Sequence, residues 1–177
     1  MVTKITLKRK LIFMRHAESK EQQEKILSSS VENEQINPSK RGLSETGIKQ
    51  INETTKKFKD SFPKVGTVMT SGSARHMETA LAFHVPIHVT PFLLEVNVGD
   101  FEGKKYTPEY VEELNNALLN GESYHNSEKL ASIVKRIFDV IRLANDMELS
   151  SKNSDILLVT SVHIVMIIDN ILNKVYK

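Results

Sequence analysis

Short apolar runs alternate with longer amphipathic segments along most of this chain. Four runs have the length of buried β-strands and are bounded by polar or turn-forming residues: 11–14, 66–71, 86–90 and 155–160. We expect the first of them to be buried on both faces. Strands that alternate with helices form a mainly parallel sheet covered by helices on both sides. The pattern therefore predicts an α/β fold, a three-layer α/β/α sandwich with a mainly parallel sheet.

The segments between these runs carry apolar residues at helical spacing. The predicted helices cover residues 20–27, 45–62, 73–83, 108–120, 130–144 and 164–175. Ser44 and Thr107 are suitable N-caps, and Gly121 is a suitable residue to end a helix. Residues 28–41 and 91–103 show no period. We interpret residues 28–41 as a surface loop, and a loop of that length inside a compact domain is usually functional.

Composition narrows the class of protein. With 177 residues the chain suits one domain, and its 40% hydrophobic and 26% charged residues are ordinary for a soluble globular protein. The net charge is +2 with both signs interspersed, and no apolar stretch approaches the roughly 20 residues that span a bilayer. The absence of cysteine excludes disulfides and thiolate chemistry. We expect a cytoplasmic monomer or homodimer without a nucleic-acid or membrane partner.

Charged and titratable side chains follow the predicted strands. Arg15 and His16 come directly after the first run, and Arg75 lies in the first turn of the helix after the second. Glu95 follows the third run and His163 follows the fourth. Because the carboxyl ends of parallel strands meet at one edge of a sheet, we expect these side chains to lie close together. Arginine matches phosphate oxygens, and neutral histidine has a ring nitrogen free for attack, so the set predicts a phosphoryl-transfer site.

The same segments resemble the histidine phosphatase superfamily, the phosphoglycerate mutase-like proteins. Residues 15–19 match the family's Arg-His-Gly-Glu-Ser/Thr, and residues 43–47 match its Leu-Thr-x-x-Gly. Residues 71–80 are similar to Ser-Pro-Leu-x-Arg-Ala-x-Gln-Thr-Ala, and residues 95–103 to Glu…Gly-x-Trp-Glu-Gly. His163 falls where the second catalytic histidine of the family belongs. The resemblance covers nearly the whole chain and implies one histidine phosphatase-like domain over residues 1–177, with a phosphoglycerate mutase-like fold.

The resemblance implies a catalytic role for five residues. His16 is the expected nucleophile, which forms a phosphohistidine. Arg15 and Arg75 are expected to bind the equatorial phosphate oxygens and to keep His16 neutral. His163 is expected to donate to the same oxygens in its charged form. Glu95 is expected to protonate the leaving oxygen and then to activate water, which requires that apolar surroundings raise its pKa.

Ser19 and Gln22 are further candidates for phosphate contact, although either side chain can instead cap or solvate a helix. The two arginines supply the charge that a metal ion supplies in other phosphatases, so we expect neither a metal nor a cofactor. The four remaining histidines, among them His76, are interpreted as surface or core residues.

Three departures from the family pattern bear on activity. Ala17 replaces the usual glycine, and Gln22 stands where the family often has asparagine. Ile164 replaces the glycine that usually follows the second histidine, and we expect its side chain to crowd a position of close approach. The expected function is hydrolysis of a small phosphorylated metabolite. The alternatives are phosphoglycerate mutase-type phosphotransfer and a catalytically weakened module that binds phosphate or a phosphoprotein.

Overall fold

The sheet of this protein consists of parallel strands in the computed structural model, which describes residues 7–30, 41–148 and 154–175. The strands are β1 (Leu11–Arg15), β2 (Val65–Thr70), β3 (Ile87–Val89) and β4 (Asp155–Thr160). Their order in the sheet is β1-β4-β2-β3, and every pairing is parallel. Arg15 pairs with Thr160 and Thr70 pairs with Val159. Because these strands end at the same level, the residues that follow them emerge together at one edge.

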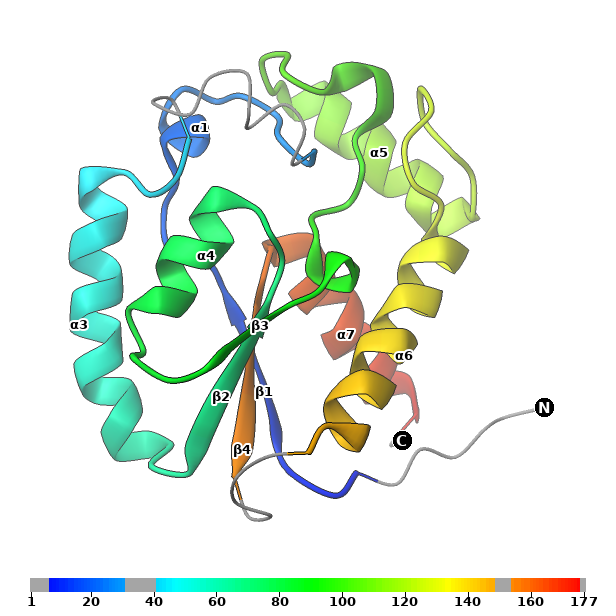
Figure 1. Cartoon of the computed structure of the whole chain (residues 1–177). Helices are drawn as coiled ribbons and strands as arrows, with labels where there is room; N and C mark the ends of the chain where they lie inside the picture. The colour runs from blue at the N-terminus through cyan, green and yellow to red at the C-terminus, as the bar shows by residue number, and fades with distance from the viewer. Residues whose placement is uncertain (1–6, 31–40, 149–153, 176–177) are drawn as a thin grey trace.

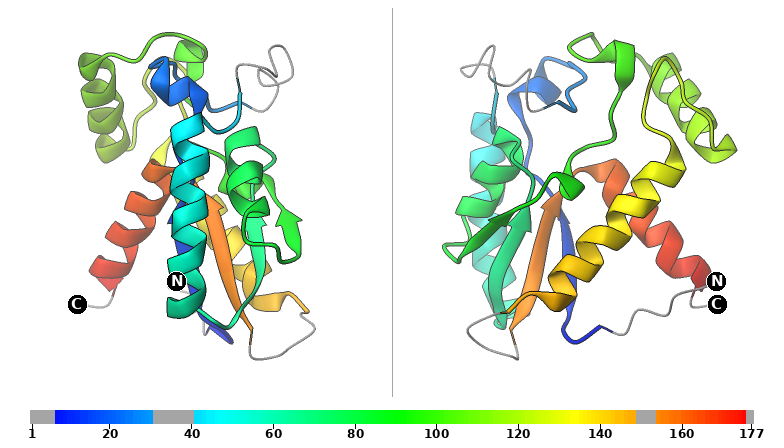
Figure 2. Two further views of the ribbon diagram at one scale, coloured as in Figure 1. Left: turned by 90° about the vertical axis from the view of Figure 1, so that its left-hand side faces the viewer. Right: turned by 45° about the vertical axis from the view of Figure 1, so that its right-hand side comes forward.

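Helices cover both faces of the sheet and its carboxyl edge (Figure 1). They are α1 (Lys20–Gln23), α3 (Glu45–Ser61), α4 (Ala74–Leu81), α5 (Pro108–Asn120), α6 (Leu130–Asp146) and α7 (Val162–Val175), with the 3-10 helices η2 (Pro91–Leu93) and η3 (Gly99–Phe101). Helices α3 and α4 lie on one face, and α6 and α7 lie on the other (Figure 2). Helices α1 and α5 lie beyond the carboxyl ends of the strands. The predicted three-layer sandwich is confirmed.

Alternate residues of the central strand β4 face opposite layers. Leu157 and Val159 belong to the apolar cluster that joins the sheet to α3 and α4. Ile156 and Leu158 instead pack in a cluster with Val140 of α6, and all four strand residues are buried. A strand with helices on both faces is apolar on both sides, which explains why this run is continuous rather than alternating.

Two elements differ from the sequence-based expectation. Residues 11–14 pack on both faces as predicted, Ile12 and Met14 against the cluster of α3 and α4, and Leu11 and Phe13 against the clusters of α6 and α7. They are only half-buried, because β1 is an edge strand. Helix α1 ends at Gln23 instead of residue 27, and Ile26 forms an isolated antiparallel bridge with Lys105. Residues 31–40 of the predicted loop lie outside the described residues.

The termini of α5 follow the expected capping chemistry. The Thr107 hydroxyl accepts a hydrogen bond from the Tyr110 N–H, and Pro108 occupies the first helical position. Gly121 ends the helix at φ +75°, in the left-handed region that favours glycine. Residues 91–103, where the sequence shows no period, contain both 3-10 helices.

Candidate active site

A pocket of about 420 Å³ opens at the carboxyl edge of the sheet, and all five catalytic candidates line it. Arg15 is the last residue of β1, and His16 follows it. Arg75 lies in the first turn of α4, and His163 lies in the first turn of α7. Glu95 follows η2. The structure thus brings together the side chains that sequence reasoning assigned to the strand ends. We call this cavity the phosphate pocket, after the ligand that the sequence analysis expects.

Hydrogen bonding to the backbone selects one tautomer of His16. The Nδ1 atom lies 2.7 Å from the Ala17 carbonyl oxygen, which can only accept, so Nδ1 carries the proton and donates it. The side chain is only 6% exposed. Burial and then the charge of Arg75 lower the pKa of His16 to about 4, with a smaller contribution from Arg15. The hydrogen bond to Ala17 and the charge of Glu95 raise this pKa, but they do not outweigh burial and the arginines. The ring is therefore neutral near pH 7, with an unprotonated Nε2 suited to nucleophilic attack.

Neighbouring polar groups hold the buried guanidinium of Arg75. Its Nη2 donates to the Ser28 carbonyl oxygen at 2.8 Å, and its Nη1 lies 3.6 Å from a carboxylate oxygen of Glu21. The same Glu21 oxygen lies 3.5 Å from Arg41 Nη1. Arg15, by contrast, is exposed to solvent. A guanidinium held in place before the substrate arrives is suited to binding phosphate oxygens with little reorganisation. Sequence reasoning missed Glu21, because it lies in a polar segment and nothing in the sequence there indicates an ion pair with a distant arginine.

Glu95 and His163 form an ion pair, with Oε1 of the carboxylate 3.3 Å from Nδ1 of the ring. Oε1 also accepts a hydrogen bond of 2.8 Å from the Val96 N–H. Burial alone raises the pKa of Glu95, but His163, the Val96 N–H and Arg75 together outweigh it and lower the pKa to about 2. Contact with Glu95 in turn raises the pKa of His163. The expected rise in the pKa of Glu95 is wrong for this arrangement, because the sequence does not show that a cationic histidine contacts it.

Arg136 of α6 supports the segment that carries Glu95. Its Nη1 donates to the carbonyl oxygens of Phe92 and Leu94, both at 2.8 Å, and its Nη2 donates to the Glu95 carbonyl oxygen at 3.3 Å. Its Nε and Nη2 donate to the Glu128 carboxylate at 2.8 and 2.9 Å. One side chain therefore connects three carbonyl groups of this segment to α6. Sequence reasoning missed it, since an arginine in an amphipathic helix has the pattern of a surface charge.

Among the described residues, no group of three or more histidine, aspartate or glutamate side chains is arranged to hold a metal ion. Within those same ranges, no helix has the length and apolar character needed to cross a membrane.

Comparison with known families identifies the family of this chain. A sequence model described as "Histidine phosphatase superfamily (branch 1)" matches residues 11–174. The chain belongs to the histidine phosphatase superfamily. The match extends from the first residue of β1 into the last turn of α7, so it includes every element that contributes to the phosphate pocket.

Solved structures show the same fold at low sequence identity. The product of the open reading frame Rv3214 from Mycobacterium tuberculosis is similar with a TM-score of 0.68 and 21% identity, over 90% of this chain and 77% of that chain. A protein described as mycobacterial hydrolase 1 gives a TM-score of 0.72 and 16% identity, over 94% and 81% of the two chains. YhfR of Bacillus stearothermophilus gives a TM-score of 0.64 and 18% identity, over 88% of this chain and 75% of that chain. A search of curated protein sequences found no match to this chain.

Two departures from the histidine phosphatase pattern leave His16 unobstructed. The Ala17 N–H donates to the Thr79 hydroxyl at 3.1 Å, and the Ala17 carbonyl accepts from His16, so the backbone of Ala17 positions this ring. Ile164 is fully buried in an apolar cluster with Ile133 and Ile168, and it does not line the phosphate pocket. The expected crowding by Ile164 is wrong, because the first turn of α7 directs this side chain into the core.

Ser19 and Gln22 both line the phosphate pocket, and they also cap α1. The Ser19 hydroxyl accepts from the Gln22 N–H at 3.3 Å, while the Gln22 side-chain oxygen accepts from the Ser19 N–H at 3.0 Å. This reciprocal capping box gives both side chains a local structural role. Their contact with phosphate stays a prediction.

His76 is one of the histidines interpreted as surface or core residues, and the structure places it in the core. The side chain is fully buried, with Nδ1 bonded to the Ser71 hydroxyl and Nε2 2.9 Å from the Ser161 hydroxyl. Its ring centroid lies 5.0 Å from that of His16. Burial, Arg75 and His16 lower the pKa of His76 well below its usual value, so a neutral ring connects the ends of β2 and β4 behind the nucleophile.

Proposed function

We propose that this chain hydrolyses phosphate monoesters through a phosphohistidine formed on His16. The observation that carries the proposal is the state of His16: a buried, neutral ring whose Nδ1 donates to Ala17 and whose Nε2 is therefore unprotonated. This nitrogen belongs to a ring that lines the same pocket as two arginines. Membership of the superfamily supports phosphatase or phosphotransferase chemistry in general.

In the first half-reaction, Nε2 of His16 attacks phosphorus, and the bond to the alcohol oxygen breaks. Arg15 and Arg75 stabilise the charge on the equatorial oxygens. The electron pair of the broken bond stays with the leaving oxygen, which takes a proton from Glu95. This step requires a protonated Glu95, whereas in the ion pair the proton resides on His163.

Substrate binding moves this proton to Glu95. A protonated His163 has two N–H donors, so a bound phosphate accepts from Nε2 while Nδ1 still faces Glu95. The Nδ1 proton then passes to Glu95, because burial is the largest single influence on this carboxyl group and favours its protonated form. The neutral ring of His163 continues to donate to phosphate through Nε2. In the second half-reaction, Glu95 as carboxylate removes a proton from water, and the water oxygen attacks phosphorus. The bond from phosphorus to Nε2 of His16 breaks, its electron pair returns to the ring, and phosphate leaves.

Trapping the intermediate tests the proposal. A phosphohistidine is a phosphoramidate, so rapid quenching with a labelled monoester should give protein-bound phosphate that is labile in acid and stable in base. His16→Ala should abolish both this adduct and turnover. His88→Ala is the matched control, because His88 is an exposed histidine of β3 outside the phosphate pocket, and it should retain both. Failure to form an adduct with any monoester in a broad panel would refute the proposal.

The same experiment distinguishes the two alternatives. A mutase-type phosphotransferase would form the adduct but return the phosphoryl group to an organic acceptor instead of water. A binding module would form no adduct, while its affinity for phosphate would fall in Arg75→Ala. The position of Ile164 in the core removes one of the three departures that favoured a binding module.

A further inference from the structure

An apolar groove begins at His163 and leads away from the phosphate pocket. It encloses about 440 Å³ between α5, α6 and α7. Its α7 wall is one helical stripe that starts at the histidine, with side chains three or four residues apart: His163, Met166, Ile167, Asn170 and Ile171. Leu118 and Leu119 of α5 and Val134 of α6 form much of the facing wall. We call this cavity the α7 groove.

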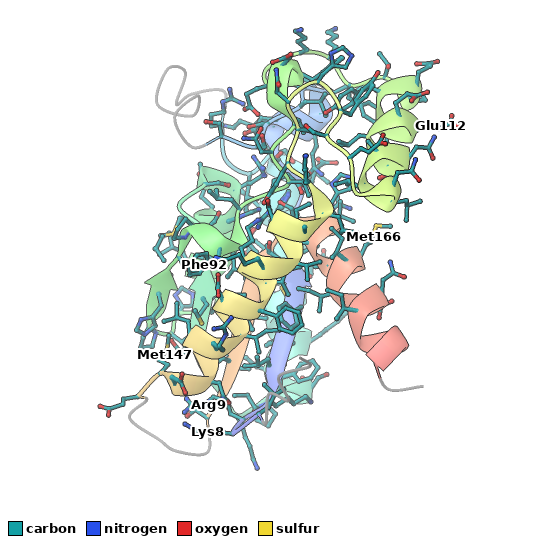
Figure 3. All side chains as sticks on the ribbon, turned by 90° about the vertical axis from the view of Figure 1, so that its right-hand side faces the viewer. Lys8, Arg9, Phe92, Glu112, Met147 and Met166 are labelled. Atoms are coloured by element: carbon teal, nitrogen blue, oxygen red, sulfur yellow. The ribbon has the colours of Figure 1, made fainter. Side chains whose placement is uncertain are left out.

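The lining of the α7 groove is apolar, although it is open to solvent. Its polar residues are His163 and two asparagines, and no described residue of the lining other than His163 is ionisable. Leu119 is 80% exposed and Met166 is 56% exposed. Figure 3 shows Met166 projecting outward from α7 below α5. Large apolar side chains exposed around one hollow of this size are typical of a binding site, and methionine adapts to ligands of varied shape.

The position of the ion pair relates this groove to the reaction. The group that protonates the leaving oxygen must contact it, so the alcohol portion of a substrate lies on the Glu95 side of phosphorus. Glu95 contacts His163, and His163 lines both the phosphate pocket and the α7 groove. The two cavities therefore share the residue that contacts the proposed acid, and the groove adjoins the phosphate pocket on the side where the alcohol portion lies.

A polar cavity of about 600 Å³ also borders Glu95, but several side chains of its lining already form hydrogen bonds within the protein. Arg136 donates to Glu128 and to three carbonyl groups. Asn126 donates to Asp100, and the Ser29 hydroxyl donates to Glu102. A sugar or other polyol would have to displace these bonds. The α7 groove requires no such exchange, because binding there replaces contact between apolar side chains and water.

We propose that the α7 groove binds the apolar alcohol portion of the substrate, so that this protein prefers amphipathic phosphate monoesters with an alkyl chain over phosphorylated sugars. The inference rests on the proposed function for the position of the phosphate group. It adds the chemical class of the alcohol.

Alkylphosphonates test binding separately from turnover, because their carbon–phosphorus bond is not hydrolysed. Affinity is measured by titration calorimetry for a series from ethyl- to octylphosphonate. We expect the dissociation constant to fall by up to about fourfold for each methylene group that the groove buries, until the groove is filled. Turnover of the matching alkyl phosphates should show the same trend in kcat/KM, since lengthening the chain beyond ethyl scarcely changes the leaving group.

Substitutions at exposed positions locate the binding site of the chain. Leu119→Gln and Met166→Gln should flatten the dependence on chain length and lose most of the affinity gained between ethyl- and octylphosphonate. Leu81→Gln is the matched control, since Leu81 is 56% exposed on α4, across the sheet from the groove, and this variant should keep the full dependence. Thermal unfolding should confirm that all three variants fold.

Each outcome decides one of the two proposals. An affinity that does not change with chain length, or a dependence that survives both groove substitutions, would overturn the α7 groove as a substrate site. A protein that dimerises and becomes monomeric in Leu119→Gln would assign this surface to a second copy, which also overturns it. Phosphonate binding that depends on chain length, without hydrolysis of any monoester, would support the groove and refute the proposed phosphatase.

Discussion

Replacing Arg136 by methionine should impair catalysis by displacing Glu95. Arg136 does not line the phosphate pocket, but its guanidinium binds the carbonyl oxygens of Phe92, Leu94 and Glu95. In Figure 3, Phe92 lies beside α6, the helix that carries this arginine. Methionine keeps an unbranched stem and a good helix propensity while it removes every donor. The segment of Glu95 then loses its connection to α6.

The geometry sets the size of the effect. Hydrogen bonds from a charged group contribute about 1.5–3 kcal/mol each, and removing one partner of a buried pair costs about 3–5 kcal/mol. The side chains of Arg136 and Glu128 are 13% and 16% exposed, so water partly solvates the carboxylate and carbonyl oxygens that lose their donor. We therefore expect the free energy of unfolding to fall by about 3 kcal/mol and Tm to fall by about 6–12 °C. If the Glu95 carboxyl moves by about 1 Å, kcat/KM should fall roughly a hundredfold.

Two substrates separate a positioning role from a loss of stability. An alkyl phosphate has a poor leaving group and needs the proton of Glu95, whereas an aryl phosphate with an acidic phenol needs little protonation. Measured well below Tm, Arg136→Met should lose most of its activity on the alkyl ester and much less on the aryl ester. Arg142→Met is the control, because this arginine of the same helix is exposed and pairs with Asp139 at the surface, so both activities should persist. Equal losses on the two esters in Arg136→Met would refute the argument.

Three further predictions concern the reacting groups. Glu95→Gln should lower kcat/KM on an alkyl phosphate by about 10²–10⁴ and on an aryl phosphate by less; equal losses would reassign the acid. The pH profile of kcat/KM should rise through about pH 4 as His16 loses its proton, and it should fall above the raised pKa of His163, which is higher than 6.5. The fall at high pH should be absent in His163→Gln. A rise near pH 6.5 instead of pH 4 would contradict the assigned environment of His16. Because Arg15 and Arg75 supply the positive charge, turnover should survive exhaustive chelation with EDTA; loss of activity that zinc or magnesium restores would contradict this assignment.

The fold was predictable because its signals are local. Continuous apolar runs such as residues 155–160 mark strands buried on both faces, and caps such as Thr107 mark helix ends. The edge position of β1 was not predictable in this way. A strand has the same composition whether it has one neighbour or two, and strand order depends on how the crossovers pack. That order, β1-β4-β2-β3, leaves residues 11–14 half-buried.

The catalytic candidates that line the phosphate pocket were predictable for a different reason. Parallel strands that end at one level bring the residues after them to a common edge, and this rule places all five catalytic candidates without any knowledge of contacts. Glu21, Ser28 and Arg136 obey no such rule. Each acts through contacts between segments far apart in the chain, as in the 2.8 Å bond from Arg75 to the carbonyl of Ser28. Residues of this kind become visible only in three dimensions.

The pKa of Glu95 shows where reasoning from neighbours in sequence fails. Its neighbours Leu93, Leu94 and Val96 predict a raised pKa, and burial does act in that direction. His163 is 68 positions away, and its charge together with the Val96 N–H reverses the sign. Placing both groups at one edge of the sheet left several pairings open, since Arg15 and Arg75 were equally available to the carboxylate. In the proposed mechanism, this pairing stores on His163 the proton that Glu95 later gives to the leaving oxygen.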